Sequence, residues 1–249
     1  MSKKGMTLMC AVVLAQVLVT NVDPAVALPD CTIATHLVLG ADSSYSAGAG
    51  VNGIASAIHI PSSVTLNDQP TSGSDVALIG SDEDHFVQFG WYVGQAGGLP
   101  TTSTPKLFFG QGSFSGDETL TAINASITPG TLRTFSIRRN ETPTSPNYKK
   151  VYAFLDGVQL FISGVHNYSA NLPRVVGETN YLCAEMTLDA SEDVGPPYKT
   201  LRYHTEASGY QYWLQHVNYG TPPYPYGGCW VNTRFNNEGA TSFVYGPTC

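Results

Sequence analysis

Short apolar or alternating runs, separated by turn residues, follow one another from Val51 to about Thr205, and no long segment repeats apolar residues every 3.6 positions. Their content of Val, Ile, Phe, Tyr and Thr favours strands over helices. The predicted strands are Ile54–Ile60, Phe86–Val93, Lys106–Phe109, Thr131–Arg138, Val151–Leu155, Val158–Ile162, Arg174–Leu182 and Thr200–His204. Many short strands with short turns predict an all-β fold, a curved antiparallel β-sandwich of the jelly-roll kind.

The strongest local signal is Asp156-Gly157, which stands between two of these runs. This dipeptide favours a type I′ turn, whose twist matches that of paired strands. The sequence therefore predicts a hairpin over Tyr152–Ile162. The segment Gly110–Gly116 is interpreted as a turn-rich loop, and no helical pattern follows it that would make it a phosphate cradle.

The N-terminal segment has the composition of a secretory signal peptide. Lys3 and Lys4 precede an apolar run from about Met6 to Val19, and Ala25-Val-Ala27 matches a cleavage pattern. The apolar run is too short to span a membrane well. We therefore expect a secreted, extracellular protein. The expected parts are residues 1–27 as signal peptide, 28–206 as a β-sandwich domain, and 207–249 as an aromatic and proline-rich C-terminal extension.

Four cysteines would remain after cleavage: Cys31, Cys183, Cys229 and Cys249. In an oxidising compartment they predict two disulfides, and all three pairings are open. There is no C-x-x-C and no Cys/His cluster with zinc spacing, so we expect neither a metal nor a cofactor. Asn124, Asn140 and Asn167 begin sequons for N-glycosylation.

The charge balance argues against two classes of partner. Loss of Lys3, Lys4 and Asp23 with the signal peptide would change the formal net charge from −7 to −8, and no Lys/Arg-rich patch is present. Nucleic acid and anionic membranes are poor partners for such a chain. We expect an extracellular monomer whose partner is a polypeptide or a glycan.

Two polar residues stand inside predicted strands, Gln88 in Phe86–Val93 and Glu178 in Arg174–Leu182. Because side chains alternate along a strand, Gln88 and Tyr92 share one face while Val87, Phe89 and Trp91 share the other. If the latter three pack between two sheets, Gln88 and Tyr92 project from the outer face. A carboxyl group held in an apolar cleft has a raised pKa. Beside an amide that can stabilise an oxyanion, it forms a plausible hydrolytic pair.

A simpler interpretation is that Gln88 and Glu178 are ordinary polar residues on a solvated sheet face. His85 and His204 lie at strand edges or ends and are interpreted as surface or hydrogen-bonded histidines. Asp82-Glu-Asp84 is either a calcium ligand set or, preferably, a solvated acidic loop. No G-x-S-x-G motif is present, whereas a Ser/His/Asp triad stays open because its members need not be close in sequence.

The order of several short motifs over about residues 45–206 resembles the neprosin family of secreted proteins. These motifs are Gly53, Ala57-Ile-His-Ile-Pro61, Phe86-Val-Gln-Phe-Gly-Trp91, Pro105-Lys-Leu-Phe108, and Gly177-Glu178 followed by Met186. The resemblance implies a curved antiparallel sandwich with one catalytic carboxylate on the strand ending in Gly-Trp and a second on the Gly-Glu strand. This sequence has Gln88 at the first position, so the pair resembles the Gln/Glu dyad of the related fungal glutamic peptidases. That departure fits either a Gln/Glu peptidase or a relative that has lost catalysis.

The resemblance implies an acid-acting glutamic endopeptidase. Glu178 would act as general base toward the attacking water, and the Gln88 amide would stabilise the oxyanion. Tyr92 would orient the substrate. The alternative is a non-catalytic extracellular module that binds carbohydrate or a cell surface through Tyr92, Trp91 or the aromatic residues of the extension.

Overall fold

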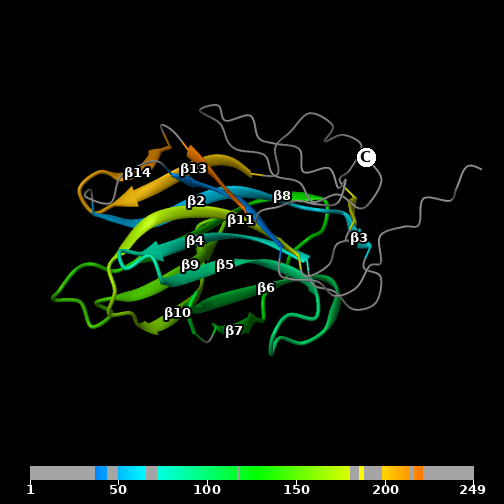
Figure 1. The fold of residues 1–249 in the computed structure, drawn as a ribbon, viewed down its shortest axis with the longest axis horizontal. Helices are drawn as coiled ribbons and strands as arrows, with labels where there is room; N and C mark the ends of the chain where they lie inside the picture. The colour runs from blue at the N-terminus through cyan, green and yellow to red at the C-terminus, as the bar shows by residue number, and fades with distance from the viewer. Residues whose placement is uncertain are drawn as a thin grey trace, which may run out of the picture.

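The computed structural model describes residues 37–43, 50–65, 72–116, 118–179, 185–187, 198–213 and 216–220. Throughout these ranges the regular secondary structure is β-strand, and the strand pairs are antiparallel. The strands form two sheets, whose strands run across the view in Figure 1. The predicted all-β antiparallel sandwich is therefore confirmed.

Among the described residues, the larger sheet has seven strands in the order β15-β1-β11-β4-β5-β6-β7. Their bounds are His216–Gly220, Leu37–Ser43, Ala170–Thr179, Ser72–Gly80, His85–Gly94, Thr102–Ser113 and Glu118–Ile123. The candidate site residues Gln88 and Glu178 both belong to this sheet.

The second sheet, over the same described ranges, has six strands in the order β10-β9-β8-β2-β13-β14. Their bounds are Val158–Val165, Lys150–Leu155, Thr131–Arg139, Val51–Ile60, Tyr198–Thr205 and Gly209–Tyr212. A short pair, β3 (Ser63–Thr65) and β12 (Glu185–Thr187), stands apart from both sheets.

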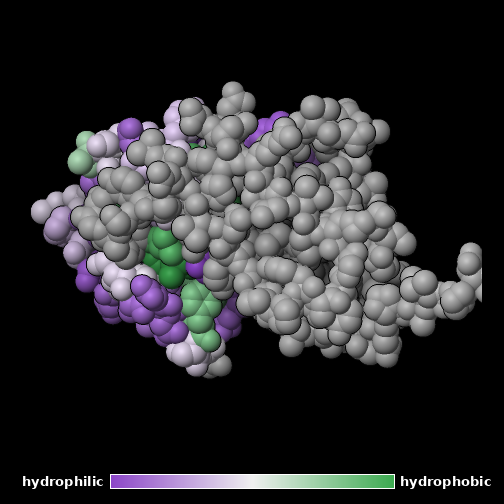
Figure 2. Space-filling view, turned by 45° about the horizontal axis from the view of Figure 1, so that its top comes forward, coloured by the Kyte–Doolittle hydropathy of each residue, from purple (hydrophilic) through white to green (hydrophobic). Residues whose placement is uncertain are grey.

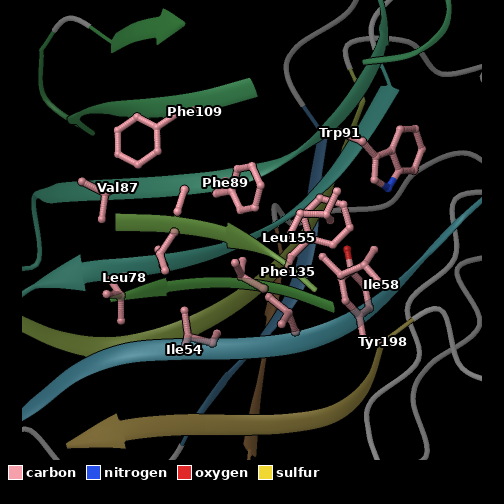
Figure 3. Close-up of a cluster of buried hydrophobic side chains, with 14 of the residues drawn as sticks. Ile54, Ile58, Leu78, Val87, Phe89, Trp91, Phe109, Phe135, Leu155 and Tyr198 are labelled. Atoms are coloured by element: carbon pink, nitrogen blue, oxygen red, sulfur yellow. The ribbon is translucent and has the colours of Figure 1, made fainter. Parts of the chain in front are cut away.

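The main hydrophobic core lies between the two sheets (Figure 3). Strand β5 contributes Val87, Phe89 and Trp91, all at most 1% exposed, and the opposite sheet contributes Phe135 and other residues. The rings of Phe89 and Phe135 have centroids 5.2 Å apart across the interface. Since side chains alternate along β5, this packing places Gln88 and Tyr92 on the outer face of the seven-stranded sheet, as predicted.

The predicted hairpin at Asp156-Gly157 is present. Both residues have positive φ (49° and 81°), which is the geometry of a type I′ turn. The Asp156 carboxylate accepts the Thr134 backbone N–H at 2.8 Å and pairs with Arg133 Nε, so the turn is tied to the neighbouring strand β8. Val158 then pairs with Leu155, which starts the register of β9 and β10.

The eight predicted strands correspond to strands of the structure, and several of these are longer than predicted. Positions 180–182 of the predicted strand Arg174–Leu182 lie outside the described residues. The largest difference concerns Gly110–Gly116, because β6 continues to Ser113 and the interpretation of the whole segment as a loop is wrong for its first four residues. These residues pair with both β5 and β7, so cross-strand hydrogen bonds keep the glycines extended.

Several strands lie outside the eight predicted ranges, and two of them follow residue 206. β14 and β15 pair with β13 and β1, so strand pairing continues past the expected end of the sandwich domain. β1 and β4 also lie outside the predicted ranges, and β4 begins with the polar, glycine-containing run Ser72-Gly-Ser-Asp75.

Other predictions fall outside the described residues. They include the signal peptide, the four cysteines with their disulfides, and most of the extension 207–249. Among the sequons, Asn124 and Asn167 are exposed, whereas Asn140 is half-buried and donates its side-chain amide to Ser145 Oγ at 3.0 Å. Glycosylation at all three stays a prediction. A search of the described residues finds no helix with the length and apolarity needed to cross a membrane.

Replacing Phe89 by alanine is expected to lower the free energy of unfolding by about 3–5 kcal/mol, because a fully buried ring is lost from the contact between the sheets. Urea unfolding measures the change. Val158→Ala is the control, because Val158 is 62% exposed. A loss within about 0.5 kcal/mol for Phe89→Ala, as expected for the control, would contradict the observed core.

Candidate active site

Gln88 lies near the centre of the outer face of the seven-stranded sheet. It pairs with Ala77 of β4 on one side and Gly110 of β6 on the other, and Ala77 pairs in turn with Arg174 of β11. The side chain of Gln88 is only 6% exposed. A buried amide requires hydrogen-bond partners, so its contacts determine what it can do chemically.

The partner of the Gln88 amide is Glu118, the first residue of β7. Gln88 Nε2 donates to Glu118 Oε1 at 2.7 Å. The contact spans β6, which carries Gly110 opposite Gln88 and Gly112 opposite Glu118. A methyl group on Gly110 would lie 2.7 Å from Gln88 Cγ and 2.8 Å from Nε2. The glycines thus make the room in which the amide meets the carboxylate.

Glu118 was missed by the sequence analysis because Gly110–Gly116 was interpreted as a loop. The useful signal was present, since Gly110 and Gly112 stand two residues apart in a strand-like run. Alternate glycines leave one face of a strand bare and permit close approach of neighbouring groups.

Position 178 lies on the same outer face as Gln88. Glu178 pairs with Gly73 of β4, and Gly73 pairs with Tyr92 of β5, which is four residues beyond Gln88. With about 3.3 Å per residue along a strand and about 4.8 Å between strands, the Cα atoms of Gln88 and Glu178 lie roughly 16 Å apart. The register therefore puts the two predicted catalytic residues on one face, but they are not paired with each other: they lie two strands and four residues apart.

Apolar groups flank Gln88 on the outer face. On one side Phe86 packs with Ala77 and Ile79, and on the other Tyr92 packs with Phe108. On the side of the molecule drawn in Figure 2, the coloured surface shows hydrophobic area next to strongly hydrophilic area. A polar pair between apolar clusters has strengthened electrostatic interactions, because the local dielectric constant is low.

Arg174 supplies a cation on the same face. Its guanidinium carbon lies 5.9 Å from the ring centroid of Phe114, and that ring stacks on Phe86 with centroids 5.0 Å apart. Arg174 is 7% exposed. It stands in the same transverse row as Gln88, two strands away.

Tyr92, predicted to orient a substrate, holds a loop in this structure. It is 2% exposed, and its hydroxyl donates to the Pro100 carbonyl at 2.9 Å. Burial raises the pKa of this hydroxyl. Trp91 is 1% exposed within the core. The rings of Tyr92 and Trp91 are thus closed to stacking with a sugar, which corrects the binding surface suggested for the alternative function. A role of Tyr92 toward substrate stays a prediction.

The acidic loop Asp82–Asp84 binds protein groups. Asp82 accepts the backbone N–H of Asp84 and of His85, and its other oxygen lies 2.6 Å from His85 Nδ1. Asp84 accepts the backbone N–H and the hydroxyl of Ser115. Across the described ranges, no three His, Cys, Asp or Glu side chains gather to form a metal site. The carboxylates of Asp82 and Asp84 therefore order the two loops that flank the β5–β6 pair.

Two histidines outside the site, His204 and His166, have hydrogen-bond partners. His204 is 7% exposed and its Nδ1 lies 2.6 Å from Asn52 Oδ1, which agrees with the prediction of a hydrogen-bonded histidine. His166 is buried, and its Nε2 lies 2.9 Å from Ser163 Oγ. Burial, together with the nearby Arg139 guanidinium, lowers the pKa of His166 to about 4.

A separate polar cavity of about 280 Å³ is lined by His85, Gln111, Gly112, Ser113, Thr119, His166 and Tyr168. His85, Gln111 and Ser113 belong to the opposite face of the sheet from Gln88, because they alternate with the outer-face residues of β5 and β6. The cavity is therefore distinct from the Gln88–Glu118 pair.

Comparisons with known proteins add distant likenesses. No protein-family model and no curated protein matches the sequence. Among solved structures, the chain is similar to SCP-B, a member of the Eqolisin family of peptidases in complex with the tripeptide Ala-Ile-His, at 11% identity and a TM-score of 0.46. This match covers 84% of this chain and 98% of that chain.

Two further solved structures are similar over shorter stretches. The kappa-carrageenase from Pseudoalteromonas carrageenovora matches at 8% identity and a TM-score of 0.33, over 58% of this chain and 54% of that chain. Porphyranase B from Zobellia galactanivorans matches at 7% identity and a TM-score of 0.34, over 62% of this chain and 65% of that chain.

Gly110→Ala is expected to displace Gln88 and to lower the free energy of unfolding by about 1–3 kcal/mol, because the added methyl group overlaps a buried side chain. Gly97→Ala is the matched control, because a Cβ there has no atom within 4 Å. Chemical denaturation compares the two variants. Equal stability of both would contradict the close contact of Gln88 with Gly110.

The titration of His166 provides a pH prediction. Its folded pKa of about 4 is below the ordinary value of 6.5. Between these values the unfolded chain binds more protons, so the free energy of unfolding falls as the pH is lowered from 6.5 to about 4. An NMR titration of the His166 ring should show a midpoint near 4. A midpoint near 6.5 would show that the ring is accessible to water when protonated.

Proposed function

We propose that this chain is a secreted, acid-acting endopeptidase of the glutamic type, with Gln88 and Glu178 as its catalytic pair. The observation that carries the proposal is the position of Gln88. It is a buried amide on the outer sheet face, bound through Nε2 to a carboxylate and on the same face as Glu178. An amide held in this way can donate a hydrogen bond to a developing oxyanion.

Gln88 and Glu178 lie on one face with their Cα atoms roughly 16 Å apart by register. The hydrogen bond to Glu118 directs the Gln88 amide toward β7, on the side of β5 away from β11. The peptide substrate and the attacking water must therefore span the part of the face that lies between the two groups. Arg174 and the apolar clusters around Gln88 would strengthen the hydrogen bond to an anionic intermediate.

The proposed reaction is hydrolysis of a peptide bond. Glu178 takes a proton from the water as its oxygen attacks the scissile carbonyl carbon, and the carbonyl oxygen becomes an oxyanion bound by Gln88 Nε2. Collapse of the tetrahedral intermediate breaks the C–N bond. Glu178 then returns the proton to the leaving amine, so the carboxylate is regenerated and no cofactor takes part.

The test is cleavage of denatured proteins by the purified mature chain from about pH 2.5 to 7, with Glu178→Gln and Gln88→Ala beside it. We expect cleavage with an acid optimum, a loss of about 10²–10³-fold in kcat for Gln88→Ala and a larger loss for Glu178→Gln. Gln159→Ala is a matched control, because Gln159 lies exposed on β10 of the other sheet. Folded wild-type protein that cleaves nothing at any pH would overturn the proposal.

A further inference from the structure

The sheet register, the glycines of β6 and a short hydrogen bond together bring Gln88 and Glu118 into contact. The amide is buried, whereas Glu118 is exposed at the start of β7. The two residues are two strands apart, and the hydrogen bond of 2.7 Å forms over glycines of the intervening strand. A side chain at position 110 would overlap Gln88. Sheet register, glycine placement and hydrogen bonding therefore all converge on this pair.

The chemistry of the contact fixes the orientation of the amide. A glutamine side chain can turn its oxygen or its nitrogen toward a neighbour, but an ionised carboxylate only accepts hydrogen bonds. While its carboxyl group is ionised, Glu118 therefore selects the orientation in which Nε2 faces it. A hydrogen bond to a charged acceptor is also stronger than one between neutral groups. The amide nitrogen carries two hydrogens, so a second N–H is left to donate elsewhere.

We propose that Glu118 is a positioning residue for peptide hydrolysis: its carboxylate holds the Gln88 amide with nitrogen outward, so that the second N–H of Nε2 meets the oxyanion. This inference rests on the proposed function. The opposite orientation would present the Gln88 carbonyl oxygen to the oxyanion, and two negative partial charges would then face each other. Glu118 acts through Gln88 and takes no proton in the reaction.

Two substitutions at position 118 distinguish the effect of the Gln88 amide orientation from the effect of the charge at position 118. In Glu118→Lys the ammonium group only donates, so it selects the Gln88 oxygen and turns the nitrogen away. A positive charge near an oxyanion would by itself favour the reaction. A fall in kcat therefore points to the reversed amide. In Glu118→Gln the neighbour can both donate and accept, so both orientations coexist.

The expected effects differ in size. Glu118→Lys should lower kcat by about 10²–10³-fold, as does removal of an oxyanion donor, with KM little changed. Glu118→Gln should lower kcat by about twofold, because about half of the molecules keep the competent orientation. Thr119→Lys is the control: it places the same ammonium group at the next residue, on the opposite face of β7, and its kcat should stay within about twofold of wild type.

A second measurement, by NMR, detects the contact between Gln88 and Glu118 without an assay of peptide cleavage. The side-chain amide of ¹⁵N-labelled Gln88, assigned by its absence in Gln88→Ala, should show one proton shifted downfield by the carboxylate in wild type and Thr119→Lys. That shift should disappear in both Glu118 variants. Circular dichroism and thermal unfolding of each variant establish that it is folded.

The outcomes distinguish the two proposals. If wild type cleaves peptides but folded Glu118→Lys keeps full kcat, the positioning role is overturned and the proposed function stands. If wild type cleaves nothing, the proposed function fails, and the role of Glu118 in catalysis fails with it. A Gln88 amide signal that is the same in wild type and both Glu118 variants would overturn the contact itself.

Discussion

The packing of Phe89 against Phe135 fixes the two faces of the seven-stranded sheet. Because side chains alternate along a strand, a residue that packs between the sheets forces its neighbours outward. Phe89 stands next to Gln88, so the core contact decides that the amide projects from the outer face. A one-residue slip of β5 would bury Gln88 in the core and remove the candidate site. The sandwich core and the proposed chemistry thus depend on one register.

The chemistry of the outer face depends on positions without side chains as well as on the polar side chains that the face carries. Gly110 and Gly112 carry no side chains, and the space above β6 lets Gln88 reach Glu118. Glu178 lies on the same face through its register with Gly73. The sheet therefore sets two carboxylate positions around one amide. We propose a different role for each, Glu178 toward water and Glu118 toward the amide.

Much of this architecture could be predicted from local pattern. The alternation in Phe86–Val93 predicted the outward position of Gln88, and Asp156-Gly157 predicted its hairpin. Strand β4 could not be recognised, because its polar, glycine-containing start has low strand propensity and its pairing with β11 and β5 supplies the stability. Glu118 was missed because Gly110–Gly116 was interpreted as a loop, so the pairing of β6 with β7 that brings Glu118 to Gln88 was not predicted.

The most direct test of the account is a crystal structure with a peptide phosphinate, which imitates the tetrahedral intermediate, built on a sequence that the protein cleaves. The account predicts a phosphinate oxygen within about 2.6–3.2 Å of Gln88 Nε2, with the other N–H of that nitrogen still on Glu118. It also predicts the Glu178 carboxylate on the opposite side of the phosphorus atom. Binding of the phosphinate away from the outer face, with Gln88 untouched, would contradict the central claim.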